Sequence, residues 1–282
     1  MPGQSRCTAI LADRLPIGES PHWLYYVDVV LATDRGDGTD QLPAPSAAQL
    51  HDPILLDEIH VWRASLERPG ADVERLRLLL AADEQQRADR FRFDRDRCRY
   101  IVGRAQLRVL LGRYLGLVPE QVRFEYGAFE KPRLAHPGPS FNLTHSGPVA
   151  LYAFTAAGEI GVDVELDDAD FAKERIAERF FSAAEVAVLR SLPERLQARA
   201  FLTCWTRKEA FIKARGDGLS LALDSFDVSL EPGAPAALLR TAWSTEETRK
   251  WYIEDLSDPD AGYVAAMALS GNARRVVKRD LF

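Results

Sequence analysis

The chain has 282 residues, 46% of them hydrophobic and 28% charged, which is the composition of a folded globular protein with a substantial core. Its formal net charge of -6 excludes a molecule that coats nucleic acid as a whole, so any anion site has to be a local cluster of cations. The three cysteines lie far apart, which excludes a disulfide framework or a paired-cysteine metal site and is typical of a reducing cytoplasm.

The first residues show neither a signal peptide nor a membrane anchor. They lack the basic-then-apolar pattern of a signal peptide. The longest apolar run, at residues 22–33, is interrupted by Asp28 and is too short to span a bilayer. We therefore expect a cytoplasmic protein with no membrane partner.

Residues 1–50 are predicted to be an N-terminal extension, to which the sequence assigns no role. They contain the strand-like stretch WLYYVDVVLA, a piece rich in glycine and aspartate, and the linker-like segment QLPAPSAAQ. Regular patterns begin near Ile59, where EIHVWRAS alternates like a strand. One or two short helices follow, and then a long helix is predicted from Asp94 to Leu115, with Gly116 as its C-cap.

The next segments are predicted strands, which have the sequences QVRFEY, SFNLTH, VALYAFTA and EIGVDVE. Ser182 and Glu185 then form a capping-box pair that predicts the start of a helix. A longer helix is expected over residues 195–215, followed by the strands FDVSL, WYIEDL and YVAAMAL. Both halves combine helices with a few strands, so we predict an α+β fold with two similar lobes, at residues 51–158 and 159–282.

The stretch GVDVE, at residues 161–165, places two carboxylates on one strand. Because side chains alternate between the faces of a strand, Asp163 and Glu165 share one face, and Ile160, Val162 and Val164 share the other. Taken alone, this pattern is also that of a half-buried strand whose polar face is solvated.

Two further stretches carry polar groups. In WTRKEAFIK, Glu209 and Lys213 are four residues apart on one helix face, which alone also describes a surface ion pair. In FNLTHSG, a strand is predicted to end in a polar turn at residues 144–146, where His145 alone is more often structural. Carboxylates that converge on one point repel each other unless a cation lies between them, and an oxygen-only set suits Mg²⁺. A lysine beside such a site balances phosphate charge, so the combination indicates phosphoryl-type transfer.

At this point the sequence resembles a known family. GVDVE, followed 42 residues after Asp163 by WTRKEAFIKA, resembles the two signature motifs of the 4′-phosphopantetheinyl transferases. The segments EKPRL, FNLTHSG and GDGLSLALDSFDV are similar to those of the Sfp-type branch. The resemblance covers about residues 58–282 and implies two α/β lobes in one monomeric chain, related by a pseudo-twofold axis, with the active site between them.

The resemblance also implies the reaction. Family members transfer the 4′-phosphopantetheine arm of coenzyme A to a serine of an apo acyl or peptidyl carrier protein and release adenosine 3′,5′-bisphosphate. By resemblance, Asp163, Glu165 and Glu209 would hold Mg²⁺. Glu209 would also be the base for the serine hydroxyl, or would orient a water molecule that acts as the base. Lys213 would neutralise the departing phosphate. Lys208 is a candidate for contacts with the diphosphate or the carrier, or else a solvated side chain.

The coenzyme site is also implied by resemblance. Thr144 and His145 match the position at which the family grips coenzyme A phosphates. Lys131 matches a lysine near the nucleotide, with Arg133 as a companion.

An arginine-rich segment precedes these residues. Six arginines lie between residues 87 and 99. By resemblance, Arg87 and Arg99 best match the family's contacts with the 3′-phosphate. Aspartates interleave with the arginines, so the alternative is a solvated helix face.

Two other functions stay open at this stage. One is a non-catalytic relic that binds coenzyme A or carrier proteins, although such a relic would be expected to lose a metal carboxylate or the lysine. The other is a nucleic-acid binder that uses the arginine-rich helix. The acidic net charge, the interleaved aspartates and the lack of a binding motif argue against it. The carrier itself, from fatty-acid, polyketide or nonribosomal-peptide synthesis, is not specified by the sequence.

Overall fold

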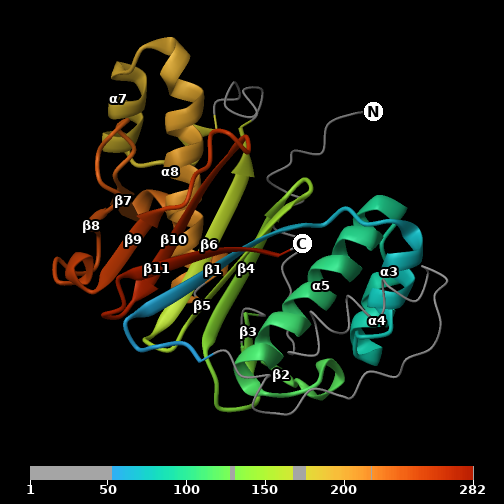
Figure 1. The fold of residues 1–282 in the computed structure, drawn as a ribbon. Helices are drawn as coiled ribbons and strands as arrows, with labels where there is room; N and C mark the ends of the chain where they lie inside the picture. Colours follow the sequence, from blue (N-terminus) through green and yellow to red (C-terminus); the bar gives the residue numbers. More distant parts are fainter. Residues whose placement is uncertain (1–52, 128–130, 168–175, 217, 282) are drawn as a thin grey trace, which may run out of the picture. The chain divides into compact units, whose positions relative to one another are not determined.

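The computed structural model describes residues 53–127, 131–167, 176–216 and 218–281 (Figure 1). The predicted N-terminal extension, residues 1–50, and its strand-like stretch lie outside the described residues. By their contacts, the described residues form two compact units. We call residues 67–138 the helical unit, and residues 54–66 together with 139–281 the sheet unit.

The helical unit consists of helices and one small hairpin. Its elements are α3 (Gly70–Arg77), α4 (Ala82–Ala88), α5 (Asp94–Leu115), the 3-10 helix η2 (Pro119–Gln121), β2 (Phe124–Tyr126) and β3 (Pro132–Leu134). The long helix α5 has the predicted bounds, and Gly116 ends it with a φ of 65°, a conformation that glycine adopts without a steric cost.

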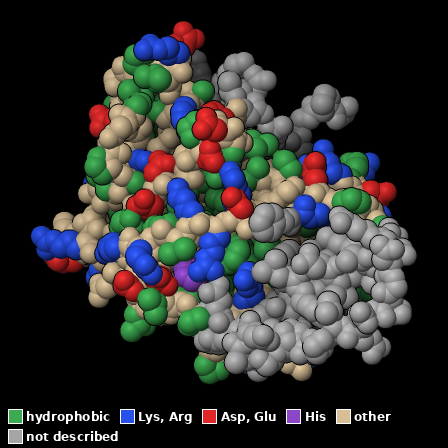
Figure 2. Space-filling view, in the orientation of Figure 1, with side chains coloured by type: hydrophobic (Ala, Val, Ile, Leu, Met, Phe, Trp, Pro, Cys, Tyr) green, Lys and Arg blue, Asp and Glu red, His purple; other side chains and the backbone are tan. Residues whose placement is uncertain are grey.

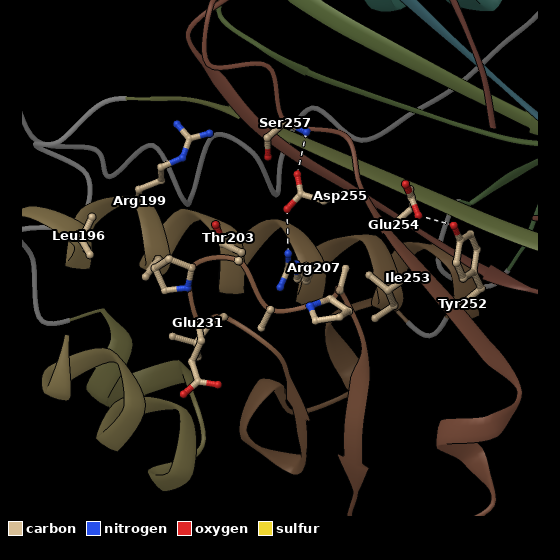
Figure 3. Close-up of a pocket in the computed structure, with 17 residues that line it drawn as sticks. Leu196, Arg199, Thr203, Arg207, Glu231, Tyr252, Ile253, Glu254, Asp255 and Ser257 are labelled. Atoms are coloured by element: carbon tan, nitrogen blue, oxygen red, sulfur yellow. Dashed lines mark hydrogen bonds and ion pairs between the residues drawn. The ribbon is translucent and has the colours of Figure 1, made fainter. Parts of the chain in front are cut away.

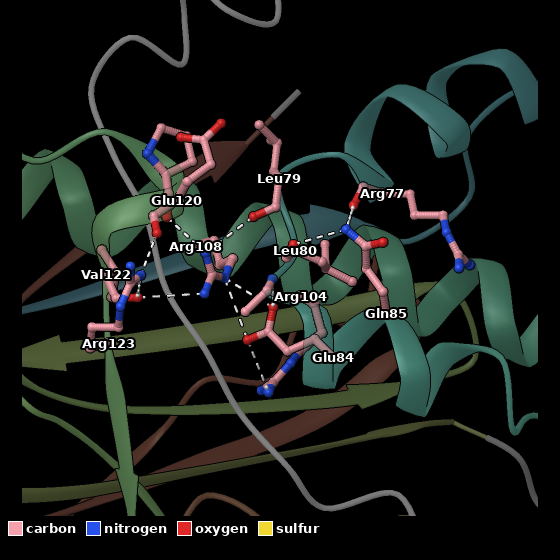
Figure 4. Close-up of polar contacts among 12 residues, drawn as sticks. Arg77, Leu79, Leu80, Glu84, Gln85, Arg104, Arg108, Glu120, Val122 and Arg123 are labelled. Atoms are coloured by element: carbon pink, nitrogen blue, oxygen red, sulfur yellow. Dashed lines mark hydrogen bonds and ion pairs between the residues drawn. The ribbon is translucent and has the colours of Figure 1, made fainter.

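A buried ion pair holds α4, α5 and η2 together (Figure 4). The Arg108 Nε atom lies 3.0 Å from Glu84 Oε2, and both side chains are 2% exposed. Glu84 also accepts a hydrogen bond from the Ala81 backbone at the start of α4, and Arg108 donates to the carbonyl groups of Leu79 and Pro119. Since each charge has several polar partners, this pair fixes the packing of the unit without leaving a buried charge uncompensated.

The sheet unit contains two larger sheets and a hairpin. One sheet has the order β11-β1-β5-β4, the second has the order β6-β10-β9, and β7 pairs with β8. Their bounds are β1 (Glu58–Ser65), β4 (Ser140–Ser146), β5 (Val149–Thr155), β6 (Glu159–Leu166), β7 (Phe226–Val228), β8 (Leu238–Thr241), β9 (Trp251–Asp255), β10 (Tyr263–Ser270) and β11 (Arg275–Leu281). Only the β1–β11 pair is parallel among the described strand pairs.

Three helices and several 3-10 turns belong to the sheet unit. They are α6 (Ala177–Phe180), α7 (Ala183–Ser191), α8 (Glu194–Arg215), η4 (Gly218–Ser220), η5 (Leu223–Ser225) and η6 (Glu247–Arg249). The predicted capping box is confirmed, because Ser182 Oγ accepts from the Glu185 backbone at 3.2 Å and Glu185 Oε2 accepts from the Ser182 backbone at 2.9 Å. The long helix α8 packs against β6 and β10 (Figure 1). No helix in the described ranges is long and apolar enough to cross a membrane.

The mixed α+β class is confirmed, but the contacts group the strands differently from the predicted lobes. Ile59 and Val61 of β1 share one buried core with Val162 of β6 and Met267 of β10. The boundary predicted at residue 158 therefore falls inside the sheet unit, and the lobes 51–158 and 159–282 remain a prediction.

Candidate active site

The strand β6 carries the two carboxylates of GVDVE on one face, as the alternation predicts. Ile160, Val162 and Val164 are buried on the opposite face. Asp163 and Glu165 are only 1% and 8% exposed, however, so their face is covered as well. The alternative of a solvated outer face is therefore wrong, and the carboxylates need polar or cationic partners inside the protein.

The helix α8 covers this face because Gly161 lets it approach. A Cβ atom on Gly161 would lie 2.1 Å from the carbonyl oxygen of Ala210 and 2.3 Å from the backbone nitrogen of Ala214. Only a residue without a side chain allows such a contact between a strand and a helix backbone. The alternation of the strand puts Gly161 on the same face as the carboxylates, but the sequence did not reveal that this glycine lets a helix approach. A glycine inside a strand was the available signal.

Lys213 of α8 reaches the carboxylates of β6. Its Nζ atom donates to Asp163 Oδ1 at 2.5 Å, to Thr144 Oγ1 at 3.1 Å and to the carbonyl oxygen of Val162 at 3.2 Å. Glu209, one turn earlier, is 1% exposed. The alternative of a solvated ion pair between Glu209 and Lys213 is therefore wrong, because α8 contributes a buried glutamate and a partly buried lysine beside the carboxylates of β6.

Two hydroxyl groups of β4 also bind the carboxylates. Thr144 Oγ1 donates to Asp163 Oδ1 at 3.2 Å, and Ser146 Oγ donates to Glu165 Oε2 at 2.8 Å. The segment predicted as a polar turn is thus still strand, because β4 continues through Ser146. His145 lies between the two hydroxyl residues and is exposed. The role of Ser146 was missed, although its spacing of two from Thr144 already placed both on one strand face.

Burial and a neighbouring charge raise the proton affinity of Glu165. Burial, and then the charge of Asp163, raise the pKa of Glu165 to about 8, with a smaller contribution from Glu209, while Ser146 and Lys213 oppose the shift. The second oxygen of Asp163, Oδ2, is buried without a hydrogen-bond partner. The site therefore holds a carboxylate oxygen that the surrounding donors do not satisfy.

A hard divalent cation fits this deficit. The acceptors are oxygen atoms, which suit Mg²⁺, and the unpartnered Asp163 Oδ2 is one available ligand. Within the described residues, no three Asp, Glu, His or Cys side chains converge as a ready metal site, and Lys213 occupies the other oxygen of Asp163. The chemistry of the donors thus fits Mg²⁺, whereas their present conformations satisfy part of the charge with Lys213 instead.

The sequence left two environments open for Lys208, a contact with the diphosphate or the carrier and a solvated surface, and the structure shows neither. Lys208 is fully buried, and Nζ lies 2.7 Å from the carbonyl oxygen of Leu223, 2.5 Å from that of Phe226 and 2.8 Å from Glu185 Oε2. An ammonium group has three N–H donors, so this environment uses all of them. Lys208 therefore ties α8 to α7 and to the start of β7, and it has no donor left for a diphosphate.

The other predicted coenzyme contacts lie in the helical unit. The Arg99 Nη2 atom is 2.7 Å from Glu67 Oε1, and the Arg87 guanidinium carbon lies 5.8 Å from the centre of the Tyr100 ring. Arg133 is exposed on β3, and Lys131 directly precedes that strand. Their contacts with coenzyme A remain predictions.

A pocket of about 580 Å³ lies elsewhere in the sheet unit, between α8, β9 and residues 230–236 (Figure 3). Its lining includes none of the predicted site residues. Both of its arginines are paired, as Arg207 Nη2 lies 2.8 Å from Asp255 Oδ2 and Arg199 Nη1 lies 2.6 Å from Asp167 Oδ2. The cluster on β6 and α8 is therefore the better candidate for chemistry.

Comparisons with known proteins identify the family of the chain. Residues 159–268, which include both signature motifs, match the family model described as the 4′-phosphopantetheinyl transferase superfamily. Residues 62–157 match the model described as 4′-phosphopantetheinyl transferase, N-terminal. The chain thus belongs to the 4′-phosphopantetheinyl transferase superfamily.

Individual relatives place it within that superfamily. It is 40% identical over 222 residues to the 4′-phosphopantetheinyl transferase HetI of Nostoc sp., which covers 77% of this chain and 90% of the relative. It is 33% identical over 173 residues to the 4′-phosphopantetheinyl transferase Sfp of Bacillus subtilis, covering 60% of this chain and 76% of that one. These similarities show a member of the Sfp type.

Proposed function

We propose that this chain transfers the 4′-phosphopantetheine arm of coenzyme A to a serine hydroxyl of an apo acyl or peptidyl carrier protein. Membership of the family supports this activity. The observation that carries it is the cluster in which GVDVE supplies the buried Asp163 and Glu165, and WTRKEAFIK supplies the buried Glu209 and the partly buried Lys213. A non-catalytic relic has no reason to keep three buried carboxylates beside a partly buried lysine, because burying carboxylates costs free energy.

The proposed reaction assigns one task to each residue. Asp163, Glu165 and Glu209 would hold Mg²⁺, which when bound would neutralise charge on the diphosphate. Glu209 accepts the hydroxyl proton of the carrier serine while the serine oxygen forms a bond to the phosphorus atom of the phosphopantetheine arm. The bond from that phosphorus to the bridging oxygen breaks, and its electrons leave with adenosine 3′,5′-bisphosphate. Lys213 donates a hydrogen bond to the departing phosphate, which requires it to exchange its contact with Asp163.

The proposed coenzyme contacts are those that the family resemblance assigns, apart from Lys208. They are Thr144, His145, Lys131, Arg133, Arg87 and Arg99. We also propose that the enzyme acts as a cytoplasmic monomer without a nucleic-acid partner. In support, Lys and Arg side chains are interspersed with Asp and Glu over the face drawn in Figure 2, which is unlike the single-sign surface of a protein that coats nucleic acid.

The activity is tested by mass spectrometry of a carrier protein. The enzyme is incubated with coenzyme A, Mg²⁺ and several apo carriers, and a gain of about 340 Da is expected, the mass of the transferred arm. Carrier binding without a mass gain would favour the non-catalytic alternative and refute the proposed transfer.

The proposed contact of Arg99 with the 3′-phosphate makes a separate prediction. Arg99→Ala is expected to raise the apparent KM for coenzyme A about tenfold, because a hydrogen bond between charged groups is worth about 1.5–3 kcal/mol. The KM for the analogue that lacks the 3′-phosphate should change little. Arg95→Ala is the matched control, since Arg95 is 71% exposed on the same helix. An equal rise for both substrates would reject the assignment.

A further inference from the structure

The polar side chains of β4 join two sheets that share no backbone pairing. We call Asn142, Thr144 and Ser146 the β4 polar row, since they occupy alternate positions of the strand. The described strands place β4 at the edge of one sheet and β6 at the edge of the other, and the two strands lie in contact (Figure 1). Asn142 Oδ1 accepts from the Val162 backbone of β6 at 2.9 Å, so the row begins with a fixed alignment of the strands.

The hydrogen atom of the Thr144 hydroxyl has only one suitable acceptor among the described side-chain contacts of Thr144. Lys213 Nζ lies 3.1 Å from Thr144 Oγ1 and donates to it, because an ammonium group has no lone pair to accept with. The hydroxyl hydrogen is therefore directed to Asp163 Oδ1, at 3.2 Å.

The same arrangement recurs two residues later. The Leu166 backbone nitrogen donates to Ser146 Oγ at 3.2 Å, and a backbone N–H cannot accept in return. The Ser146 hydroxyl hydrogen is therefore directed to Glu165 Oε2, at 2.8 Å. Each carboxylate of β6 is thus held by one hydroxyl of β4 whose direction is set by a second donor.

We infer that Thr144 and Ser146 are positioning residues that orient Asp163 and Glu165 for a divalent cation. This inference rests on the proposed function, because it assigns the two carboxylates to the cation. Each hydroxyl binds one oxygen of its carboxylate and fixes the side-chain rotamer. For Asp163, the other oxygen, Oδ2, is left buried and without a partner, as a ligand atom requires. Partners that orient metal ligands in this way typically contribute about 10–100-fold in metal affinity.

Binding of Mn²⁺, a spectroscopic substitute for Mg²⁺, tests the inference without relying on activity. Ser146→Ala and Thr144→Val each remove one hydroxyl, and each is expected to raise the Kd for Mn²⁺ about tenfold, measured by electron paramagnetic resonance with and without coenzyme A. In transfer assays of Ser146→Ala, whose hydroxyl is assigned no contact with coenzyme A, the apparent KM for Mg²⁺ should rise by a similar factor, whereas kcat at saturating Mg²⁺ should change less than threefold. A purely structural role would not produce this separation of KM and kcat.

Two matched variants control for the loss of a hydroxyl as such. Ser270→Ala removes a hydroxyl that accepts from the Glu159 backbone of β6 at 3.1 Å and touches neither carboxylate, so Mn²⁺ affinity should stay at the wild-type value. Thr144→Ser keeps the hydroxyl and should retain most of the affinity that Thr144→Val loses. Thermal unfolding of each variant identifies a loss of affinity that arises from misfolding.

The outcomes separate this inference from the proposed function. Wild-type affinity for Mn²⁺ in folded Ser146→Ala and Thr144→Val would overturn the inference and leave the transferase activity standing. Weakened Mn²⁺ binding in both variants of a protein that modifies no carrier would support the inference and overturn the activity. A wild-type protein that binds no Mn²⁺ with or without coenzyme A would overturn the inference outright.

Discussion

Asp163→Asn is expected to lower the rate of phosphopantetheine transfer by a factor of about 1000 or more. A bound divalent cation is worth several kcal/mol of charge stabilisation in the transition state, and each 1.36 kcal/mol corresponds to a factor of ten in rate. Asparagine keeps the shape of the side chain but removes the charge and one cation-binding oxygen. The rate is measured by mass spectrometry of the carrier over a range of Mg²⁺ concentrations.

Asp167→Asn supplies the control for this substitution. Asp167 follows β6 directly, is 35% exposed and pairs with Arg199, so removal of its charge should leave transfer within about twofold of the wild type. A folded Asp163→Asn enzyme with near-normal transfer would refute the metal role of Asp163, whatever the effect of Asp167→Asn.

The sequence predicts the local structure of the site better than its surroundings. The alternation in β6 correctly placed Asp163 and Glu165 on one face, because strand geometry depends only on neighbouring residues. Whether that face is solvated depends on α8, which begins almost thirty residues later in the chain. That α8 covers the carboxylate face of β6 therefore became evident only from the close approach of the helix at Gly161.

Lys208 illustrates the same limit. A lysine next to a proposed catalytic glutamate resembles a phosphate ligand, and lysines are seldom fully buried. Burial is tolerated here because residues 185, 223 and 226 bring three oxygen acceptors to one ammonium group. A single sequence does not reveal that convergence, since it depends on how α7, α8 and β7 pack. The capping box at Ser182 was predictable because all of its partners lie within four residues.

Gly161→Ala is expected to lower the free energy of unfolding by about 3 kcal/mol, at the upper end of the usual cost of overpacking. The added methyl group would lie 2.1 Å from a backbone oxygen and 2.3 Å from a backbone nitrogen of α8, and backbone atoms of a long helix cannot turn aside as a flexible side chain can. The helix must move away from β6 as a unit. Thermal unfolding should show a fall in Tm of roughly 10 °C, at about 2–4 °C per kcal/mol for a domain of this size.

The same displacement should weaken catalysis in the molecules that stay folded. Glu209 and Lys213 move with α8, whereas Asp163 and Glu165 stay on β6, so the two motifs separate and we expect transfer to fall about hundredfold. Gly70→Ala is the control, because a Cβ atom there would meet no atom from a distant part of the chain within 4 Å, and both stability and transfer should stay near wild type. If Gly161→Ala unfolds at the wild-type Tm and keeps its activity, α8 does not depend on this glycine to approach β6. If Gly161→Ala loses stability but keeps full transfer when folded, the close approach of α8 to β6 serves packing alone. The reaction would then tolerate a larger shift between GVDVE and WTRKEAFIK than phosphoryl-type chemistry normally allows.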